Sequence, residues 1–264
     1  MPAVSNAGTL RIHSFATASE MGFAAATHVA DRIRSLAQQT EVVPVVFATG
    51  ASQLETLRAL TVLPGIPWNQ VIGFHMDEYI GLSAQHPASF RRYLREELVQ
   101  RVSMREFHEI DGEASDPEDF CKEYTELLNS RQLKLCLAGI GENGHLAFND
   151  PPEADFNDPK DVKIVLLDQA CRRQQVNEGW FSSLREVPVN AITMTIPALL
   201  RIPELVLSVP GERKRSILQR TLTESITTAC PATVLRMHAN THLYVDAESY
   251  PSDIPADVYS KPVQ

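Results

Sequence analysis

The sequence is poor in cysteine, has no excess of positive charge and contains no long apolar run. Scattered thiols that form no Cys-x-x-Cys pair are typical of free cysteines in a reducing compartment, so we expect a cytoplasmic protein. No apolar run is long enough to span a bilayer, and residues 1–10 lack the basic and apolar regions of a signal peptide, so we expect no membrane partner. The four cysteines are Cys121, Cys136, Cys171 and Cys230.

The charge balance is acidic, with 24 Lys and Arg against 33 Asp and Glu and a net charge of −9. Nucleic-acid binding needs a basic surface patch, so we expect no nucleic-acid partner. A small anionic ligand is still compatible with this charge, because a few local donors suffice to bind it. A chain of 264 residues can bury one large core, and it contains no repeat or long linker. We therefore expect a single domain, residues 1–264.

Apolar patterns of strand and helix type alternate along the chain. Short apolar or β-branched runs predict strands at 10–15, 42–48, 71–74, 133–138, 162–167, 191–196, 205–209 and 243–245. Helical spacing predicts helices at 19–38, 53–63, 86–99, 117–129, 168–181 and 211–222, with a short turn at 197–200. This alternation predicts an α/β fold, a three-layer α/β/α sandwich with a modified Rossmann-like, mostly parallel sheet. Residues 251–264 are expected as an extended surface segment.

The most informative stretch is residues 139–150, Gly-Ile-Gly-Glu-Asn-Gly-His-Leu-Ala-Phe-Asn-Asp, which follows a predicted buried strand. Three glycines in six residues allow positive φ and close approach of the backbone to a ligand. Open α/β sheets bind their ligands at such turns. We interpret this stretch as an active-site loop with His145 as its most reactive group. Glycine-rich turns are also common in proteins where they have no catalytic role, so the loop alone does not show that it belongs to an active site.

Two other turns resemble anion sites. Residues 49–52, Thr-Gly-Ala-Ser, join a strand to a helix, where free N–H groups and the helix dipole favour a phosphate. The alternative is a simple Ser52 N-cap, and the Gly-Lys-Ser/Thr ending of a P-loop is absent. Lys214 lies among three cations at a predicted helix start, which suits an anionic ligand better than the helix dipole. The alternative there is a solvated basic face.

Asp77 and Glu78 follow the predicted strand at 71–74 directly. Catalytic groups often occupy such positions, although a solvated loop with an N-cap aspartate is the common alternative. In a parallel sheet, the turns that follow the strands lie at one edge. We therefore expect the Thr49 turn, Asp77, His145 and Lys214 to converge on a single site.

Two motifs taken together resemble the glucosamine-6-phosphate deaminase (isomerase) family. The first is His-Met-Asp-Glu-Tyr-Ile-Gly-Leu at 75–82, followed by His-Pro-Ala-Ser at 86–89, and the second is the loop at 139–151. The similarity extends in order from about residue 42 to residue 245. The related 6-phosphogluconolactonases share the fold and the Gly-x-Gly-x-x-Gly-His turn. They typically continue with Ser-Leu-Phe-Pro, where this chain has Leu-Ala-Phe-Asn at 146–149, and have Arg in place of Tyr79.

The resemblance implies an aldose–ketose isomerisation of glucosamine 6-phosphate coupled to hydrolytic loss of ammonia, giving fructose 6-phosphate. The implied partner is therefore a small amino sugar phosphate, and the enzyme would be classed as a hydrolase. His145 would assist opening of the pyranose ring, since an imidazole can accept and donate a proton near neutral pH. Asp77 would move a proton between carbons 2 and 1. Neither a metal nor an organic cofactor is implied.

The remaining site residues match the family only in part. Asn143 stands where the family often has an acidic residue, so it can orient His145 but cannot offset an imidazolium charge. Asp150 stands where many members have glutamate, which keeps the carboxylate and shortens its reach. In the phosphate loop, Thr49, Gly50 and Ser52 match, whereas Ala51 replaces a glycine.

The phosphate site also implies two side chains from later in the chain. Lys214 matches the family's phosphate lysine. The arginine that completes the site has no clean counterpart, and we place Arg172 ahead of Arg173 for this role. Regulated members bind an N-acetylated sugar phosphate through basic residues at positions where this chain has Asp161 and Lys163, so we expect no activation of that kind. A homo-oligomer is possible, but the hexamer of those members does not carry over.

Three alternatives remain at this stage. Galactosamine 6-phosphate is an alternative substrate, because no residue visibly reads the hydroxyl at carbon 4. A 6-phosphogluconolactonase is an alternative reaction, against which residues 146–150 argue. A non-catalytic sugar-phosphate sensor is a third, although it would need neither Asp77 nor His145.

Overall fold

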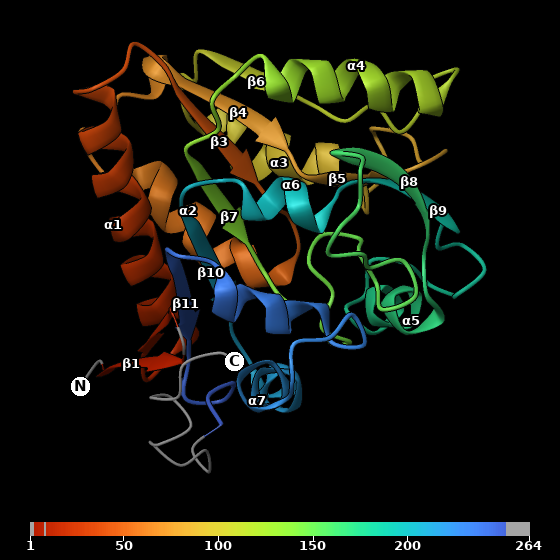
Figure 1. Ribbon diagram of the computed structural model, residues 1–264. Helices are drawn as coiled ribbons and strands as arrows, with labels where there is room; N and C mark the ends of the chain where they lie inside the picture. Colours follow the sequence, from red (N-terminus) through yellow and green to blue (C-terminus); the bar gives the residue numbers. More distant parts are fainter. Residues whose placement is uncertain (1–2, 8, 252–264) are drawn as a thin grey trace.

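The computed structural model describes residues 3–7 and 9–251 of the chain, and the tail expected at 251–264 lies outside them except for residue 251 (Figure 1). The main sheet has the strand order β1-β2-β11-β10-β7-β3-β4-β6. β1 runs antiparallel to β2, and every other neighbouring pair is parallel. The strands are β1 (Ala3–Ala7), β2 (Leu10–Ser14), β3 (Val43–Phe47), β4 (Val71–His75), β6 (Glu106–His108), β7 (Leu135–Ala138), β10 (Leu205–Val209) and β11 (Thr241–Val245).

Helices cover both faces of this sheet, which confirms the predicted three-layer α/β/α sandwich (Figure 1). One face packs against α1 (Ala18–Ala37), α2 (Leu54–Val62) and α3 (Phe90–Glu97). The other packs against α4 (Pro117–Asn129), α6 (Ile196–Leu200) and α7 (Arg215–Thr223). The inner strands β3, β7 and β10 are buried on both faces, as expected for apolar runs in a parallel sheet.

A second, antiparallel sheet lies beside the main one and was not expected from the sequence. It consists of β5 (Asp77–Tyr79), β9 (Asn190–Met194) and β8 (Val162–Leu166), in that order. The predicted strands at 162–167 and 191–196 therefore pair with each other outside the parallel sheet. A third apolar cluster joins this small sheet to α5 (Gln169–Asn177). The chain thus crosses from one sheet to the other immediately before Asp77.

Local signals explain most of the element boundaries. The helix at 117–129 is confirmed together with its N-cap, because the Asp116 side chain accepts a hydrogen bond from the backbone N–H of Asp119. The helix expected at 86–99 begins only at Phe90, where Ser89 caps it through the N–H of Arg92. α5 ends at Asn177 rather than at 181, because Gly179 has a φ of 82°. The short strands β1 and β6 were missed.

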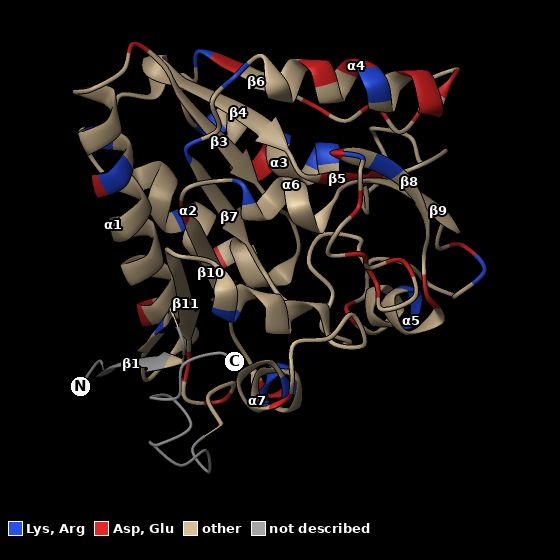
Figure 2. Cartoon of the chain, viewed as in Figure 1, with Lys and Arg blue, Asp and Glu red and all other residues tan. Residues whose placement is uncertain are grey.

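Charges of both signs are distributed over the elements of the molecule (Figure 2). The visible part of α4 carries mainly acidic colour, interrupted by a basic segment (Figure 2). Within the described residues, no helix is both long and apolar enough to cross a membrane. The four cysteines are free and buried.

Candidate active site

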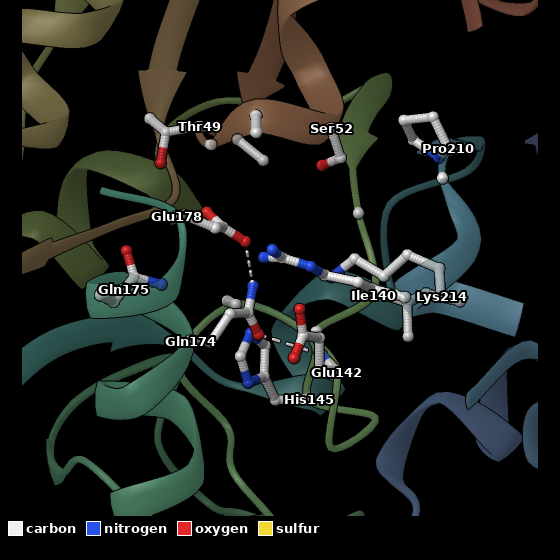
Figure 3. A pocket seen from close by; sticks show the side chains of 18 of the residues that line it. Thr49, Ser52, Ile140, Glu142, His145, Gln174, Gln175, Glu178, Pro210 and Lys214 are labelled. Carbon is white, nitrogen blue, oxygen red and sulfur yellow. Dashed lines mark hydrogen bonds between the residues drawn. The ribbon is translucent and has the colours of Figure 1, made fainter. Parts of the chain in front are cut away.

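A cleft of about 530 Å³ opens where the loops that follow β3, β4, β7 and β10 meet. Thr49, Asp77, His145 and Lys214 all line it, so the convergence predicted from the parallel sheet is confirmed. Figure 3 shows Thr49 and Ser52 on one side of the cleft, with Glu142 and His145 on the opposite side. The cleft therefore combines an anion-binding loop with titratable groups.

Two loops at the cleft share one backbone geometry. Gly50, with a φ of 95°, follows β3 and leads through a 3-10 turn (Ala51–Gln53) into α2. Gly211, with a φ of 89°, follows β10 and leads through a second 3-10 turn (Glu212–Lys214) into α7. Positive φ favours glycine at both positions. Both turns line the cleft, so two helix starts with their free N–H groups are available to an anion.

The simpler interpretation of Ser52 as a helix cap is wrong. The N-cap position of α2 is Gln53, which makes no side-chain capping bond. The Ser52 hydroxyl instead accepts a hydrogen bond from Gln53 Nε2 at 3.2 Å and lines the cleft. A Cβ at Gly139 would lie 2.8 Å from Ser52 Oγ, so glycine at 139 allows the two loops to approach each other. Thr49, Gly50, Ala51 and Ser52 all lie at the cleft wall.

Lys214 is a buried cation at the cleft, with only 8% of its surface exposed. It forms no ion pair with any described residue. Burial lowers its pKa, and the nearby Glu178 and Glu142 partly oppose that effect. Arg213 also lines the cleft and is exposed, although the sequence argument did not single it out. These two cations come from the same turn before α7.

Asp77 is the first residue of β5, where its backbone pairs with Thr193 of β9. The residue is 6% exposed and lines the cleft, and its Oδ1 atom is buried with no hydrogen-bond partner in the described part of the chain. Burial and the neighbouring Glu78 raise its pKa to about 8. The alternative of a solvated loop is therefore wrong for both carboxylates, because Glu78 is also buried and accepts hydrogen bonds from Ser89 and the backbone of Arg91.

His145 is held by a hydrogen-bond relay. Its Nδ1 lies 2.8 Å from Asp150 Oδ1, and the Asn143 side-chain amide donates to the same oxygen at 2.9 Å. The backbone N–H of His145 donates to Asn143 Oδ1 at 3.1 Å. Burial opposes ionisation of Asp150, but hydrogen bonds from His145, Asn143 and the backbone N–H of Asp168 hold its pKa below the usual value. Asn143 thus orients His145 through the backbone and through Asp150.

The loop reaches this geometry through its glycines and through the small sheet. A Cβ at Gly141 would lie 2.2 Å from His145 Nε2, so the imidazole sits against the bare backbone of residue 141. Ala147 has a φ of 51°, in the left-handed region that residues with a Cβ rarely adopt. The backbone N–H of Phe148 donates to Thr193 Oγ1, and Asn149 Nδ2 donates to the carbonyl of Met194. Strand β9 therefore anchors both this loop and Asp77.

The structure does not bring Arg172 to the cleft. Its guanidinium donates to the carbonyl oxygens of Leu184 and Val187, at 2.6 and 2.8 Å. Arg172 lies on α5, but the residues that this segment contributes to the cleft wall are Gln174, Gln175 and Glu178. The sequence argument missed these three, although the i, i+4 spacing of Gln174 and Glu178 places them on one face of a helix.

Glu142, Gln174 and Glu178 form a chain of hydrogen bonds across the cleft wall (Figure 3). Gln174 Nε2 donates to Glu178 Oε1 at 2.7 Å, and Gln174 Oε1 accepts from the backbone N–H of Glu142 at 3.1 Å. This chain connects α5 to the loop that carries His145. It also brings the carboxylates of Glu142 and Glu178 close enough to Lys214 to raise its pKa against the effect of burial.

Donor atoms of His145, Asp150 and Cys171 lie within 4.8 Å of one another, a spacing that a metal ion can accept. The chemistry of this set does not favour one. Burial raises the pKa of the Cys171 thiol well above its usual value, so that it stays protonated, whereas a metal ligand must be a thiolate. We therefore interpret His145 and Asp150 as a proton relay. Together with Asp77, they can carry out acid–base chemistry on a small phosphorylated molecule.

Comparisons with known proteins agree with this description. Residues 16–244 match the family model described as glucosamine-6-phosphate isomerases/6-phosphogluconolactonase. A glucosamine-6-phosphate deaminase of Lysinibacillus sphaericus is 34% identical over 76% of this chain and 89% of its own length. One from Exiguobacterium sp. is 34% identical over 67% of this chain and 68% of its own length.

Solved structures show the same fold. A monomeric glucosamine-6-phosphate deaminase superposes with a TM-score of 0.82 at 28% identity, over 90% of this chain and 98% of its own. A 6-phosphogluconolactonase described as putative, from Neisseria gonorrhoeae, superposes with a TM-score of 0.71 at 18% identity, over 89% of this chain and 98% of its own. The second likeness concerns the fold alone.

Proposed function

The chain belongs to the family of glucosamine-6-phosphate isomerases and 6-phosphogluconolactonases, and we propose that it converts glucosamine 6-phosphate to fructose 6-phosphate and ammonia. The main support for this proposal comes from Asp77. Its carboxyl group is buried on the wall of the cleft, and one of its oxygens has no hydrogen-bond partner among the described residues. Moving a proton between two carbons needs a base at the substrate, and a carboxyl whose pKa is raised towards the operating pH suits that role. Two relatives that are 34% identical carry the name glucosamine-6-phosphate deaminase.

The phosphate binds between the two helix starts in this proposal. Thr49, Ser52 and the backbone N–H groups of the first turn contact it from one side, and Lys214 approaches from the second turn. Arg213 takes the place that the sequence argument gave to Arg172, because it lines the cleft and Arg172 does not. Lys214 is suited to this role because it is buried without an ion-pair partner among the described residues.

His145 opens the sugar ring in the first chemical step. It takes the proton from the hydroxyl on carbon 1 and returns it to the ring oxygen. Asp150 is ionised and contacts Nδ1, so it stabilises the imidazolium that forms between these two transfers. The charge stabilisation that an acidic residue at position 143 would supply thus comes from Asp150, while Asn143 holds both groups in place.

Asp77 acts in the second step, once the open chain is formed. Its carboxylate removes the proton on carbon 2 and delivers it to carbon 1, while one proton passes from the substrate's amino group to the carbonyl oxygen on carbon 1, which converts the aldose to a ketose imine. Water then adds to the imine and ammonia leaves, so the release of ammonia is the hydrolytic part of the reaction.

Ammonia release from the purified chain tests this proposal. We expect ammonia and fructose 6-phosphate from glucosamine 6-phosphate, and none from the His145→Gln variant. Galactosamine 6-phosphate and 6-phosphogluconolactone are assayed in parallel. Ammonia from galactosamine 6-phosphate alone would keep the chemistry and change the substrate. Hydrolysis of the lactone with no ammonia from either amino sugar would contradict the proposal.

A further inference from the structure

A second group of titratable side chains lies away from the cleft, where α1 packs against β10 and β11 (Figure 1). His28 comes from α1, Glu204 precedes β10, and His242 lies near the start of β11. One donor atom from each lies within 4.8 Å of the other two. His28 Nε2 is 2.8 Å and His242 Nε2 is 3.9 Å from the same carboxylate oxygen, Glu204 Oε1. Three groups that commonly bind metals thus converge from three elements.

The Nδ1 atom of each imidazole contacts a side chain that does not belong to this group of three. His28 Nδ1 lies 2.7 Å from the Tyr244 hydroxyl, and His242 Nδ1 lies 3.0 Å from His13 Nε2. The parallel register of β2 and β11 places Tyr244 opposite His13, so these rings share the face that α1 covers. Metal-binding histidines nearly always have such an outer partner, which fixes the ring and its tautomer. Here both outer partners are present, and both Nε2 atoms lie within 4 Å of Glu204 Oε1. His242 Nε2 also contacts Asn240 Oδ1 at 3.1 Å, a contact that an ion at this site would replace.

The distances also suit a tetrahedral ion. Zn–N bonds of about 2.0–2.1 Å and Zn–O bonds of about 2.0–2.2 Å place tetrahedral ligand atoms about 3.3 Å apart. The two measured separations from Glu204 Oε1, 2.8 and 3.9 Å, lie on either side of that value. Small side-chain movements therefore suffice.

We propose that His28, Glu204 and His242 form a site for Zn²⁺ or a similar divalent transition metal, which ties α1 to strands β10 and β11 of the main sheet. Two histidines and one carboxylate are a known three-ligand set for zinc, with a water in the fourth position. This site is separate from the cleft and does not depend on the proposed function.

Two arginines lie beside the proposed ligands, and their positive charges would weaken the binding of a cation. Arg32 forms an ion pair with the other oxygen of Glu204, and it keeps that carboxylate in place. Arg11 Nη1 lies 3.2 Å from His242 Nε2, the atom that would bind the metal. Arg11 is exposed, so its side chain can move aside, but its charge must weaken binding. Replacing it should strengthen binding, a gain that misfolding cannot produce.

The test is a calorimetric titration in which Zn²⁺ alone is added to the full chain after a chelator has removed any bound metal. We expect one ion per chain at this site, with Kd raised at least tenfold by His28→Ala or His242→Ala and lowered by Arg11→Gln. The Tyr244→Phe variant, which removes an outer partner, should weaken binding by about 10-fold. Co²⁺ should give the visible spectrum of a tetrahedral complex with nitrogen and oxygen ligands.

Matched control variants distinguish Zn²⁺ binding at this site from Zn²⁺ binding by other side chains. His108→Ala removes a histidine outside the group and should leave Kd unchanged. Cys171→Ser alters the other three-residue set and should also leave it unchanged. The proposal is overturned if neither the native chain nor Arg11→Gln binds Zn²⁺, or if binding survives both His28→Ala and His242→Ala. Circular dichroism verifies that each variant is folded.

Discussion

Two buried aspartates at the cleft have their pKa values shifted in opposite directions. Burial and Glu78 raise the pKa of Asp77, whereas donors around Asp150 hold its pKa low. The difference lies in the hydrogen bonds, because Asp150 accepts three that the structure records and Asp77 Oδ1 accepts none. When the pKa values of two carboxyl groups in one site differ in this way, one group commonly transfers protons and the other stabilises charge. We assign these roles to Asp77 and Asp150, respectively.

Asp77→Asn tests that assignment through both activity and stability. Loss of the proposed base should lower kcat by about 10²–10⁴-fold while leaving substrate binding largely intact. The folded-state pKa of Asp77, about 8, exceeds the unfolded value near 3.8, so the native state binds the extra proton between these pH values. Its contribution to stability is therefore lost as pH rises through that window.

The asparagine variant cannot ionise at this position, so it should escape that loss. We expect it to exceed the native chain in free energy of unfolding at pH 8 by on the order of 1–3 kcal/mol, with a smaller difference at pH 5. Denaturant unfolding at both pH values measures the difference. Native turnover in the variant, or a stability difference that is independent of pH, would argue against the assignment.

At the scale of elements, the site depends on where glycine lets two segments approach each other. The loop after β7 contacts the turn at residues 49–52 through Gly139 and packs the imidazole of His145 against Gly141. Strand β9 then holds the far end of this loop and the backbone of Asp77 together. The small sheet therefore sets the distance between the proposed base and the proposed ring-opening group.

Gly141→Ala tests this packing. The new Cβ would lie 2.2 Å from His145 Nε2, so the imidazole must move away from its present position. A displacement of about 1 Å at a catalytic group can cost about 10²-fold in rate, and we expect a fall in kcat of that order. Gly65→Ala is the control, because it strains a turn with a φ of 72° far from the cleft and should affect stability only. Equal activity in the two variants would count against the role of Gly141.

At the scale of the whole molecule, the residues that regulated relatives would use for an effector are engaged internally. Lys163 Nζ contacts the carbonyl of Glu153 at 2.7 Å and Asp158 Oδ2 at 2.8 Å. Asp161 forms an ion pair with Arg201 and accepts a hydrogen bond from Asn129. Neither side chain is therefore available to bind an added phosphate.

We accordingly expect no activation by N-acetylglucosamine 6-phosphate. Allosteric coupling typically changes affinity by about 5–150-fold, so the apparent KM for glucosamine 6-phosphate is the sensitive quantity. Initial rates measured over a range of substrate, with and without the N-acetylated compound, should coincide. A clear fall in apparent KM would refute this expectation. The homo-oligomer considered from the sequence stays a prediction.

The sequence by itself determined the layered α/β architecture, most of the elements and the edge at which Thr49, Asp77, His145 and Lys214 meet. Periodicity reports which face of a segment is buried, and parallel strands bring their following turns to one edge. Only the tertiary structure decided that β5, β8 and β9 form a separate sheet, that Arg172 binds carbonyl oxygens away from the cleft, and that Arg213 and Gln174 line it. Strand pairing, burial and the resulting pKa of Asp77 depend on contacts between segments distant in sequence, and no local pattern contains them.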